Sequence, residues 1–235
     1  MKKGLWTLLV LGLIFSCKTE TAENNMTVSG KVKGLKKGTL YLQHIPDSLL
    51  VTVDSLEIRG DENYSFTTSL ESPEIFYLYL DKKDNNTIND RITFFGEAGN
   101  ITINTSRNAF EADAEISGSE THQKLEEYLS FMSRFNAENL EIFQSASDPN
   151  VLNDPQAMDS IQKASERNMR RSFLYALNFA LNNKDSYIAP YIAIKEVPNA
   201  GGSVLDSIYN SLPPEVANSK YGKELKALLE ARSAE

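Results

Sequence analysis

The chain has 235 residues and a formal net charge of −8, from 24 lysines and arginines against 32 aspartates and glutamates. At roughly 150 residues per domain, this length allows one or two domains and excludes a large multidomain protein, and a hydrophobic content of 41% argues against a largely disordered chain. The acidic balance argues against nucleic acid as a partner, because binding a phosphate backbone requires a surplus of basic side chains.

The first segment, residues 1–16, is predicted to be a lipoprotein signal peptide. A short basic start, residues 1–4, precedes an apolar run, residues 5–15, that is shorter than the roughly 20 residues of a membrane-spanning helix. The run ends in Ser16-Cys17, which resembles the bacterial lipobox, in which the cysteine is acylated and becomes the new N-terminus. Since Cys17 is the only cysteine of the chain, we expect a lipid anchor there and no redox thiol.

Residues 17–25 are polar and are predicted to form a flexible tether behind the lipid. Loss of Lys2 and Lys3 with the signal peptide makes the chain more acidic still, so acyl chains and not charge must hold it to a membrane, at about 0.8 kcal/mol per buried CH₂. Lys18 follows the cysteine where enterobacterial sorting uses Asp to retain a lipoprotein at the inner membrane. We therefore expect the protein to be located in the cell envelope, anchored to the outer membrane on its periplasmic or surface face.

The pattern from residue 26 onward predicts strands. Polar and apolar residues alternate over residues 27–32 and 39–43, and the Lys- and Gly-rich residues 34–38 between them predict a hairpin. Further β-prone stretches occupy residues 50–58, 64–69, 75–80, 91–95, 101–104 and 114–117. Eight short strands at this spacing predict an antiparallel β-sandwich or barrel-like domain over residues 26–118.

The period of the apolar residues then changes from two to about 3.6, so residues 119–235 are predicted to be α-helical and the fold class to be α+β. Asp154 is predicted to cap a second helix that has Pro155 in its first turn. We expect shorter helices after it, one interrupted at Pro190 and one capped by Ser203. The apolar residues of the first helix are Leu125, Tyr128, Leu129, Met132, Phe135, Leu140 and Phe143, and those of the second are Met158, Ile161, Met169, Phe173, Leu177 and Leu181.

The β half carries a series of short motifs, which are Val28-Ser29-Gly30, residues 38–42, Val53-Asp54-Ser55, Tyr64 with Phe66, and residues 95–103. In this order after a lipobox, they resemble a domain of unknown function that Bacteroidetes lipoproteins carry ahead of a thioredoxin-like (AhpC/TSA-type) domain. The family's glycine directly before the aromatic-x-Phe strand is not found here, and Gly60 lies four residues before Tyr64.

The helical half also has segments that resemble the linker helices between those two domains, at residues 117–119, 187–191 and 219–223. The resemblance would place the redox domain beyond Glu235, and the chain has no Cys-x-x-Cys, so we expect neither that domain nor thiol chemistry.

The sequence predicts no catalytic residue, no cofactor and no metal site. His44 and His122 are the only histidines, and a zinc site needs more nitrogen or sulfur ligands than these. Ser160 and Lys163 have the Ser-x-x-Lys spacing of penicillin-interacting enzymes, but neither Ser-Asp-Asn nor Lys-Thr-Gly accompanies them. We therefore expect that the chain is not an enzyme.

One repeated triplet points to a modification. Asp-Ser followed by an aliphatic residue occurs at Ser48, Ser55, Ser160 and Ser207, and it resembles the O-glycosylation sequon of exported Bacteroidetes proteins. We hypothesise that some of these serines carry glycan. The alternative is that they serve as helix caps and strand hydrogen-bonders, and Ser55, within an apolar strand, is expected to be the most protected.

Two classes of function remain. The favoured one is a non-catalytic binding or adaptor module of the envelope, held to the membrane by lipid on Cys17, with another envelope protein as partner, for example a redox protein supplied as a separate chain. The alternative is a small-ligand binder or hydrolytic enzyme whose site lies in the cleft between the β and helical halves. A deep polar pocket with shifted carboxylates favours the alternative, and a shallow apolar patch favours partner binding.

Overall fold

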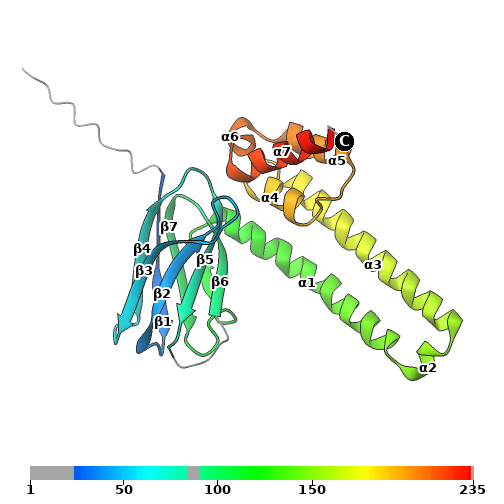
Figure 1. The fold of residues 1–235 in the computed structure, drawn as a ribbon, viewed down its shortest axis with the longest axis horizontal. Coiled ribbons are helices and arrows are strands. Elements are labelled where there is room, and N and C mark those ends of the chain that lie inside the picture. Colours follow the sequence, from blue (N-terminus) through cyan, green and yellow to red (C-terminus); the bar gives the residue numbers. More distant parts are fainter. Residues whose placement is uncertain (1–23, 84–89, 234–235) are drawn as a thin grey trace, which may run out of the picture.

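The structure is a computed structural model that describes residues 24–83 and 90–233 (Figure 1). An N-terminal β half is followed by a C-terminal helical half, so the predicted α+β class is confirmed. The predicted signal peptide, Cys17 and most of the predicted tether lie outside the described residues. The strands are β1 Asn25–Lys33, β2 Lys37–His44, β3 Val51–Arg59, β4 Asn63–Ser69, β5 Glu74–Asp81, β6 Asp90–Gly96, β7 Gly99–Ser106 and β8 Glu115–Ser117. The helices are α1 Glu120–Ala146, α2 Pro149–Leu152, α3 Pro155–Asn182, α4 Ile188–Lys195, α5 Gly202–Ser211, α6 Pro214–Ala217 and α7 Lys220–Ser233.

The strands form a sandwich of two four-stranded sheets, in the orders β4-β1-β7-β8 and β3-β2-β5-β6. The predicted sandwich is therefore correct. The expectation of a wholly antiparallel arrangement is wrong at one pair, because β1 and β7 run parallel while the other described pairs are antiparallel. β7 crosses from β6 of the other sheet through a tight turn, and this connection brings it alongside β1 in the same direction.

β1 and β2 belong to different sheets, so the predicted hairpin between them is wrong. Leu35, in the connection, is fully buried in the sandwich core, and its N–H donates to the Val32 carbonyl oxygen at 3.1 Å. Burying Leu35 between the two sheets makes the chain cross from one sheet to the other. Alternation along a strand identifies its inner face, but it does not say which neighbour the strand will pair with.

A close backbone approach lies at the centre of the first sheet. A β-carbon at Gly30 of β1 would lie 1.9 Å from the carbonyl oxygen of Ile103 on β7. Tyr64 of β4 is paired with Gly30, and its buried hydroxyl donates to that same Ile103 oxygen at 2.8 Å. The tyrosine thus reaches across β1 at the one position without a side chain, and it links three strands.

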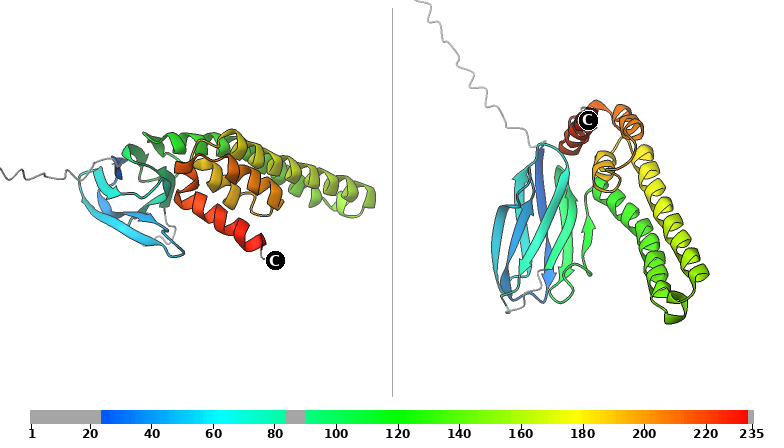
Figure 2. Two further views of the ribbon diagram at one scale, coloured as in Figure 1. Left: turned by 90° about the horizontal axis from the view of Figure 1, so that it is seen from above. Right: turned by 45° about the vertical axis from the view of Figure 1, so that its right-hand side comes forward.

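The long helices α1 and α3 form an antiparallel hairpin that projects from the sandwich, and α4 to α7 pack at the base of this hairpin (Figures 1 and 2). The predicted start of α3 is confirmed, since the Asp154 carboxylate accepts from the N–H of Gln156 at 2.9 Å. None of the described helices is long and apolar enough to cross a membrane.

Two helix expectations are wrong. Pro190 lies in the first turn of α4 and does not interrupt it, because the first-turn N–H groups have no intrahelical partner to lose. Ser203 lies inside α5, whose N-cap is Gly201, and the Ser203 carbonyl oxygen accepts from the Ser207 hydroxyl at 2.8 Å. Glycine also suits an N-cap, so the serine two residues later is a misleading signal.

The Gly30 contact predicts a stability change. We expect Gly30→Ala to lower the free energy of unfolding by about 3 kcal/mol, because the new methyl group has to displace the β7 backbone. Gly202→Ala is the matched control: nothing lies within 4 Å of its β-carbon position at the start of α5, so its stability should stay within about 0.5 kcal/mol of the unsubstituted chain. Urea unfolding measures both, and equal stabilities for the two variants would contradict the packing described for β1.

Candidate functional site

The two halves meet at an aromatic joint on the outer face of the sheet β3-β2-β5-β6. Ile75 of β5 and Phe95 of β6 point away from the sandwich core and are buried among helical side chains. The Phe95 ring meets those of Tyr191 and Tyr221 edge-on, with centroids 5.6 and 5.9 Å apart. The Ile75 N–H donates to the Tyr221 hydroxyl at 3.0 Å. Burial raises the pKa of Tyr191 to about 12 and raises that of Tyr221 as well, so both phenols are neutral at physiological pH.

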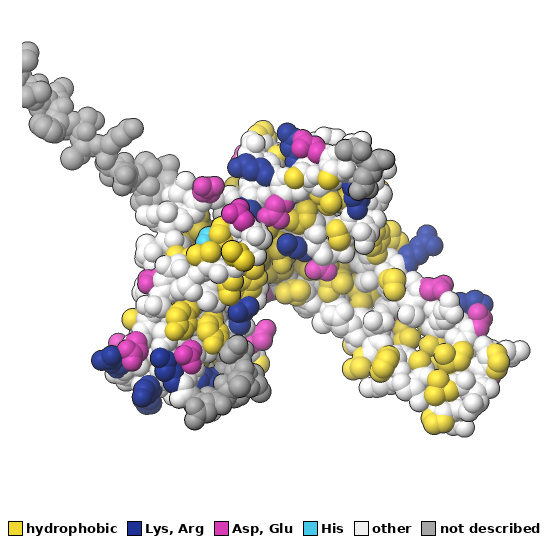
Figure 3. Space-filling view, viewed as in Figure 1, with side chains coloured by type: hydrophobic (Ala, Val, Ile, Leu, Met, Phe, Trp, Pro, Cys, Tyr) yellow, Lys and Arg dark blue, Asp and Glu magenta, His cyan; other side chains and the backbone are white. Residues whose placement is uncertain are grey.

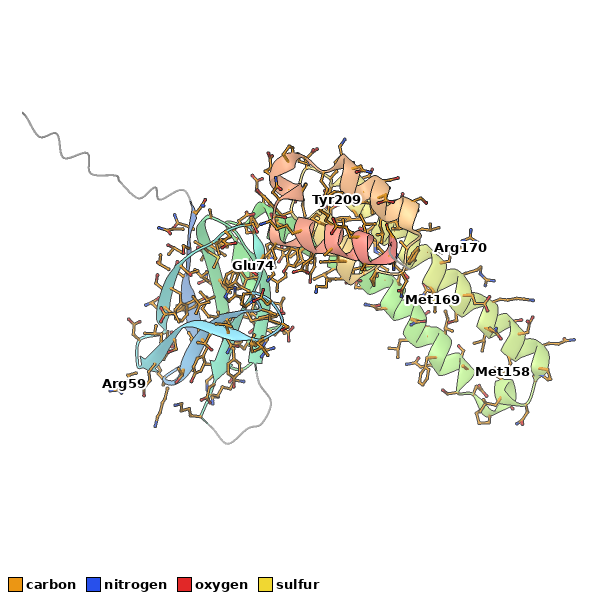
Figure 4. All side chains as sticks on the ribbon, turned by 45° about the horizontal axis from the view of Figure 1, so that its top comes forward. Arg59, Glu74, Met158, Met169, Arg170 and Tyr209 are labelled. Carbon is orange, nitrogen blue, oxygen red and sulfur yellow. The ribbon has the colours of Figure 1, made fainter. Side chains whose placement is uncertain are left out.

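A groove of about 780 Å³ lies beside this joint, where the alternative function predicts a cleft. Glu74, which Figure 4 shows on the side of the sandwich next to the helices, forms an ion pair with Lys220 of α7 in this groove. The Lys220 ammonium also donates to the Ile45 carbonyl oxygen. The Lys220 N–H donates to the Ser72 hydroxyl at 3.0 Å, and His44 Nδ1 lies 3.0 Å from the Glu74 carboxylate. These charged groups bind one another across the junction.

Three carboxyl groups outside the groove have lowered pKa values. Among the described residues, the carboxyl groups with a displaced pKa are Glu57, Asp61 and Glu62, on β3 and in the turn that follows it. Hydrogen bonds to the charged carboxylates, from Arg59 to Glu57 and from a backbone N–H to each of the other two, lower all three pKa values. The described part of the chain holds no cluster of three or more His, Cys, Asp or Glu side chains that could bind a metal.

His122 is buried at the start of α1. Its N–H donates to the Ser119 hydroxyl at 3.0 Å, which caps the helix, and its Nδ1 accepts from the Phe95 N–H at 3.3 Å. The neutral ring therefore carries its proton on Nε2, which lies 3.4 Å from the Glu126 carboxylate. Burial lowers the pKa of His122, and the nearby carboxylates of Glu126 and Glu97 oppose this shift. His44 and His122 thus have separate partners.

The predicted modification sites are exposed wherever the structure describes them. Ser55 lies on β3, an edge strand, and it is exposed, so the expected protection of this residue is wrong. Ser48 lies in the exposed loop between β2 and β3, and Ser207 is exposed on α5. Ser160 donates to the Gln156 carbonyl oxygen at 2.9 Å. Lys163, which follows Ser160 at the Ser-x-x-Lys spacing, pairs with Asp159 at 2.7 Å. Glycosylation of the four serines stays a prediction.

The hairpin exposes several of the apolar residues whose spacing predicts its two helices. Leu129, Leu140 and Phe143 of α1 are 52%, 57% and 69% exposed, and Met169 of α3 is 68% exposed. The outer halves of α1 and α3 pack on each other and on α2, and none of residues 24–83 and 90–233 adds a third layer over them. The sequence does hold a signal of this exposure. Apolar residues occupy two flanks of each helix, and contact between two helices can bury only one of them.

These four residues and two half-buried ones, Met158 and Phe173 of α3, form one surface, which we call the apolar strip. Its members are Leu129, Leu140 and Phe143 of α1 with Met158, Met169 and Phe173 of α3, and Phe173, nearest the base, also packs against the core of the helical half. On each helix the members are separated by eleven and then by three or four residues, and eleven residues make three helical turns, so they share a flank. Contacts between Phe131 and Tyr175 and between Glu138 and Arg171 close the other side of the hairpin. Both strip flanks therefore lie on the remaining side, and Figure 3 shows hydrophobic side chains gathered over the outer end of the hairpin.

The buried imidazole predicts acid sensitivity. The pKa of His122 is lower in the folded chain than its unfolded value of about 6.5, so its contribution to stability is fully present above about pH 6.5 and is lost as the pH falls through the folded pKa. His122→Asn keeps an acceptor for the Phe95 N–H and cannot titrate. Urea unfolding at pH 7 and pH 5 should therefore show a smaller loss of stability for this variant. An equal loss in both proteins would contradict the assigned role of His122.

Comparison with known protein families gives a match for only the first half of the chain. Residues 26–125 match a family model described as a domain of unknown function (DUF4369), and this stretch runs from β1 through the first turns of α1. The helices beyond residue 125 lie outside the match. Neither a curated protein nor a solved structure matches the chain. The expected resemblance to a domain of unknown function is therefore confirmed for the sandwich, which is similar to the DUF4369 family.

Proposed function

We propose that this chain is a non-catalytic binding module of the cell envelope, and that the outer half of the α1–α3 hairpin is its binding element. The observation that carries the proposal is the apolar strip, in which Leu140, Phe143 and Met169 are each more than half exposed. Large apolar side chains that gather on one exposed surface are typical of sites that a partner covers.

The composition of the strip supports protein binding. Methionine and phenylalanine are enriched at the centres of protein interfaces, where charged side chains are depleted. Several positions interspersed with the strip are uncharged, for example Ser133 and Asn136 on α1 and Gln162 on α3. Glu166 is a charged neighbour on α3, and its carboxylate accepts from the Gln162 side-chain amide at 3.0 Å. Charged residues of the same helices, such as Glu138 and Arg171, pair on the opposite side of the hairpin.

The hairpin is held rigid without help from a partner. The rings of Phe131 and Tyr175 stack with centroids 4.0 Å apart, and those of Tyr128 and Phe179 lie 5.1 Å apart nearer the base. The side-chain amide of buried Asn168 donates to the Phe135 carbonyl oxygen at 2.9 Å, which ties α3 to the α1 backbone. A preformed surface loses little conformational entropy on binding, and this favours a role in recognition.

The contacts in the groove favour this proposal over a hydrolytic enzyme or small-ligand binder. Lys220, Glu74 and His44 line the groove, and each already contacts another of the three. A ligand would have to break the link between the halves in order to use them. Their arrangement supports a structural role for the groove.

The proposal includes the lipid anchor expected at Cys17. The chain enters the sandwich at the joint, where Asn24 lines the same cavity as Glu120 and Tyr187. From this end the sandwich and the hairpin diverge, so an anchored chain would direct the hairpin tip away from the membrane (Figure 1). The residues between Cys17 and β1 could span about 25 Å when extended.

Charges placed in the strip should abolish partner binding. We expect Leu140→Glu combined with Met169→Glu to weaken binding at least thirtyfold, about 2 kcal/mol, since the charges would have to be desolvated in the complex. The control is Ser130→Glu with Asn178→Glu, which adds the same charge to the same helices at exposed positions off the strip. Crosslinking and affinity purification of the acylated protein from its native membrane measure recovery of the partner.

A chain with Cys17→Ala should lose membrane attachment and recover less partner. Circular dichroism should show the same helix content in all variants. Recovery of the same partners, in the same amounts, by the strip variant and its control would contradict the proposed function.

A further inference from the structure

The outer face of the sheet β3-β2-β5-β6 continues beyond the aromatic joint as a row of polar and aromatic side chains. Tyr41 of β2, Tyr79 of β5 and Arg91 of β6 are paired in register, so they lie side by side across three strands. They point away from the sandwich core, because their strand neighbours, such as Leu78 and Ile92, fill it. At the usual strand spacing of about 4.8 Å, the row is about 10 Å long.

Arg91 is a cation of this row without an anionic partner. Its guanidinium lies over the Tyr77 ring, 5.1 Å from the centroid, and its Nε is buried with no hydrogen-bond partner. Arg91 takes part in none of the ion pairs found among the described side chains. A partly buried charge is normally paired, so an unpaired arginine in a chain with a surplus of acidic residues favours an anion supplied by a ligand.

The carboxylates of this face already have partners of their own. The Glu57 carboxylate accepts from the Arg59 guanidinium at 2.7 Å, and the Asp81 carboxylate accepts from the Lys83 N–H at 3.0 Å. Lys37 is paired with Arg59 across β2 and β3, so it adds a second cation at the far end of the face. Figure 3 shows Lys and Arg side chains gathered on this end of the sandwich. The face is therefore locally basic, although the chain as a whole is acidic.

The tyrosines provide aromatic surface beside these cations. The rings of Tyr41 and Tyr79 stack with centroids 5.6 Å apart. On its other side, Tyr41 is paired with Ser55 of β3, whose small side chain leaves room beside the second face of the Tyr41 ring. Thr52 and Thr93 add exposed hydroxyl groups around the rings. The face thus offers aromatic rings, hydroxyls and an unpaired guanidinium to one ligand.

We propose that this face binds an acidic glycan, a polysaccharide that carries carboxylate groups. The faces of a sugar ring bear C–H groups that pack on an aromatic ring, and its hydroxyls can bond to the polar side chains around it. A carboxylate of the glycan would accept two parallel hydrogen bonds from Arg91. A peptide on this face would bury its backbone N–H and C=O groups against rings that offer them no partner. The site is separate from the apolar strip and does not depend on the proposed function.

Isothermal titration calorimetry tests the proposal on the full chain in detergent, with hyaluronan, alginate and polygalacturonate as three carboxylated polysaccharides. We expect at least one of them to bind, and we expect Arg91→Gln to weaken that binding about tenfold. The control is Arg170→Gln, which removes the same charge from an exposed position on α3 and should change binding by less than about twofold.

A second pair of variants tests the role of the ring. Tyr41→Ala should weaken binding of the same polysaccharide about fivefold, whereas Tyr41→Phe keeps the ring and should bind within about twofold of the unsubstituted chain. Circular dichroism checks that each variant keeps the fold. Equal binding by Tyr41→Ala and the unsubstituted chain would leave an anion site without a glycan and would overturn the proposal.

The remaining outcomes also decide the question. If none of the three polysaccharides binds the unsubstituted chain, the proposal is wrong. If the Arg91 and Arg170 variants bind equally well, the glycan binds elsewhere and this face is not its site. Polyglutamate is the last probe: if it binds more tightly than the best polysaccharide and Arg91→Gln abolishes that binding, the ligand is an acidic peptide and the glycan is wrong.

Discussion

Two side chains on the outer face of a sheet, Ile75 and Phe95, are buried in the helical half, and this contact fixes how the helical half lies relative to the sandwich. Both belong to a sheet whose inner face fills the sandwich core, yet they are buried in the core of the helices. The Tyr221 ring packs edge-on against Phe95, and its hydroxyl accepts a hydrogen bond from the Ile75 N–H. One side chain thus provides both an apolar contact and a hydrogen-bond partner for a buried backbone group. The ion pair of Lys220 with Glu74 adds a second link beside it. The position of the hairpin relative to the sandwich follows from these contacts.

Stability and binding make opposing demands on the hairpin. In the part of the chain that the structure describes, no third layer covers its outer half, so stacked rings between α1 and α3, the cap at Asp154 and the Asn168 amide hold it together. The apolar side chains left over from this contact face solvent and form the strip. Polar residues at these positions would suit a hairpin that works alone. The apolar strip is therefore the feature that function has to explain.

Much of the local structure was predictable from the sequence, and most of the site was not. Alternation or β-prone composition marked all eight strands, and Asp154-Pro155 marked the start of α3, because these signals act over a few residues. The assignment of β1 and β2 to different sheets depends on burial of Leu35, which no local pattern reveals. The pair of Glu74 with Lys220 joins residues 146 positions apart. Periodicity shows that one face of each helix is apolar, but it does not show whether another element packs on that face. The exposure of Leu140 and Met169 could therefore not be predicted from it.

The central claim is that the aromatic joint holds the hairpin in one position, so that the strip is presented in a fixed direction. Pulsed electron–electron double resonance tests this directly, with spin labels at Arg59→Cys, at the far end of the sandwich, and at Gln156→Cys, near the hairpin tip, in a Cys17→Ser chain (Figure 4). We expect a single narrow distance distribution that broadens when Phe95→Ala removes the ring from the joint. A broad distribution in the chain with Phe95 intact, unchanged by the substitution, would contradict the account.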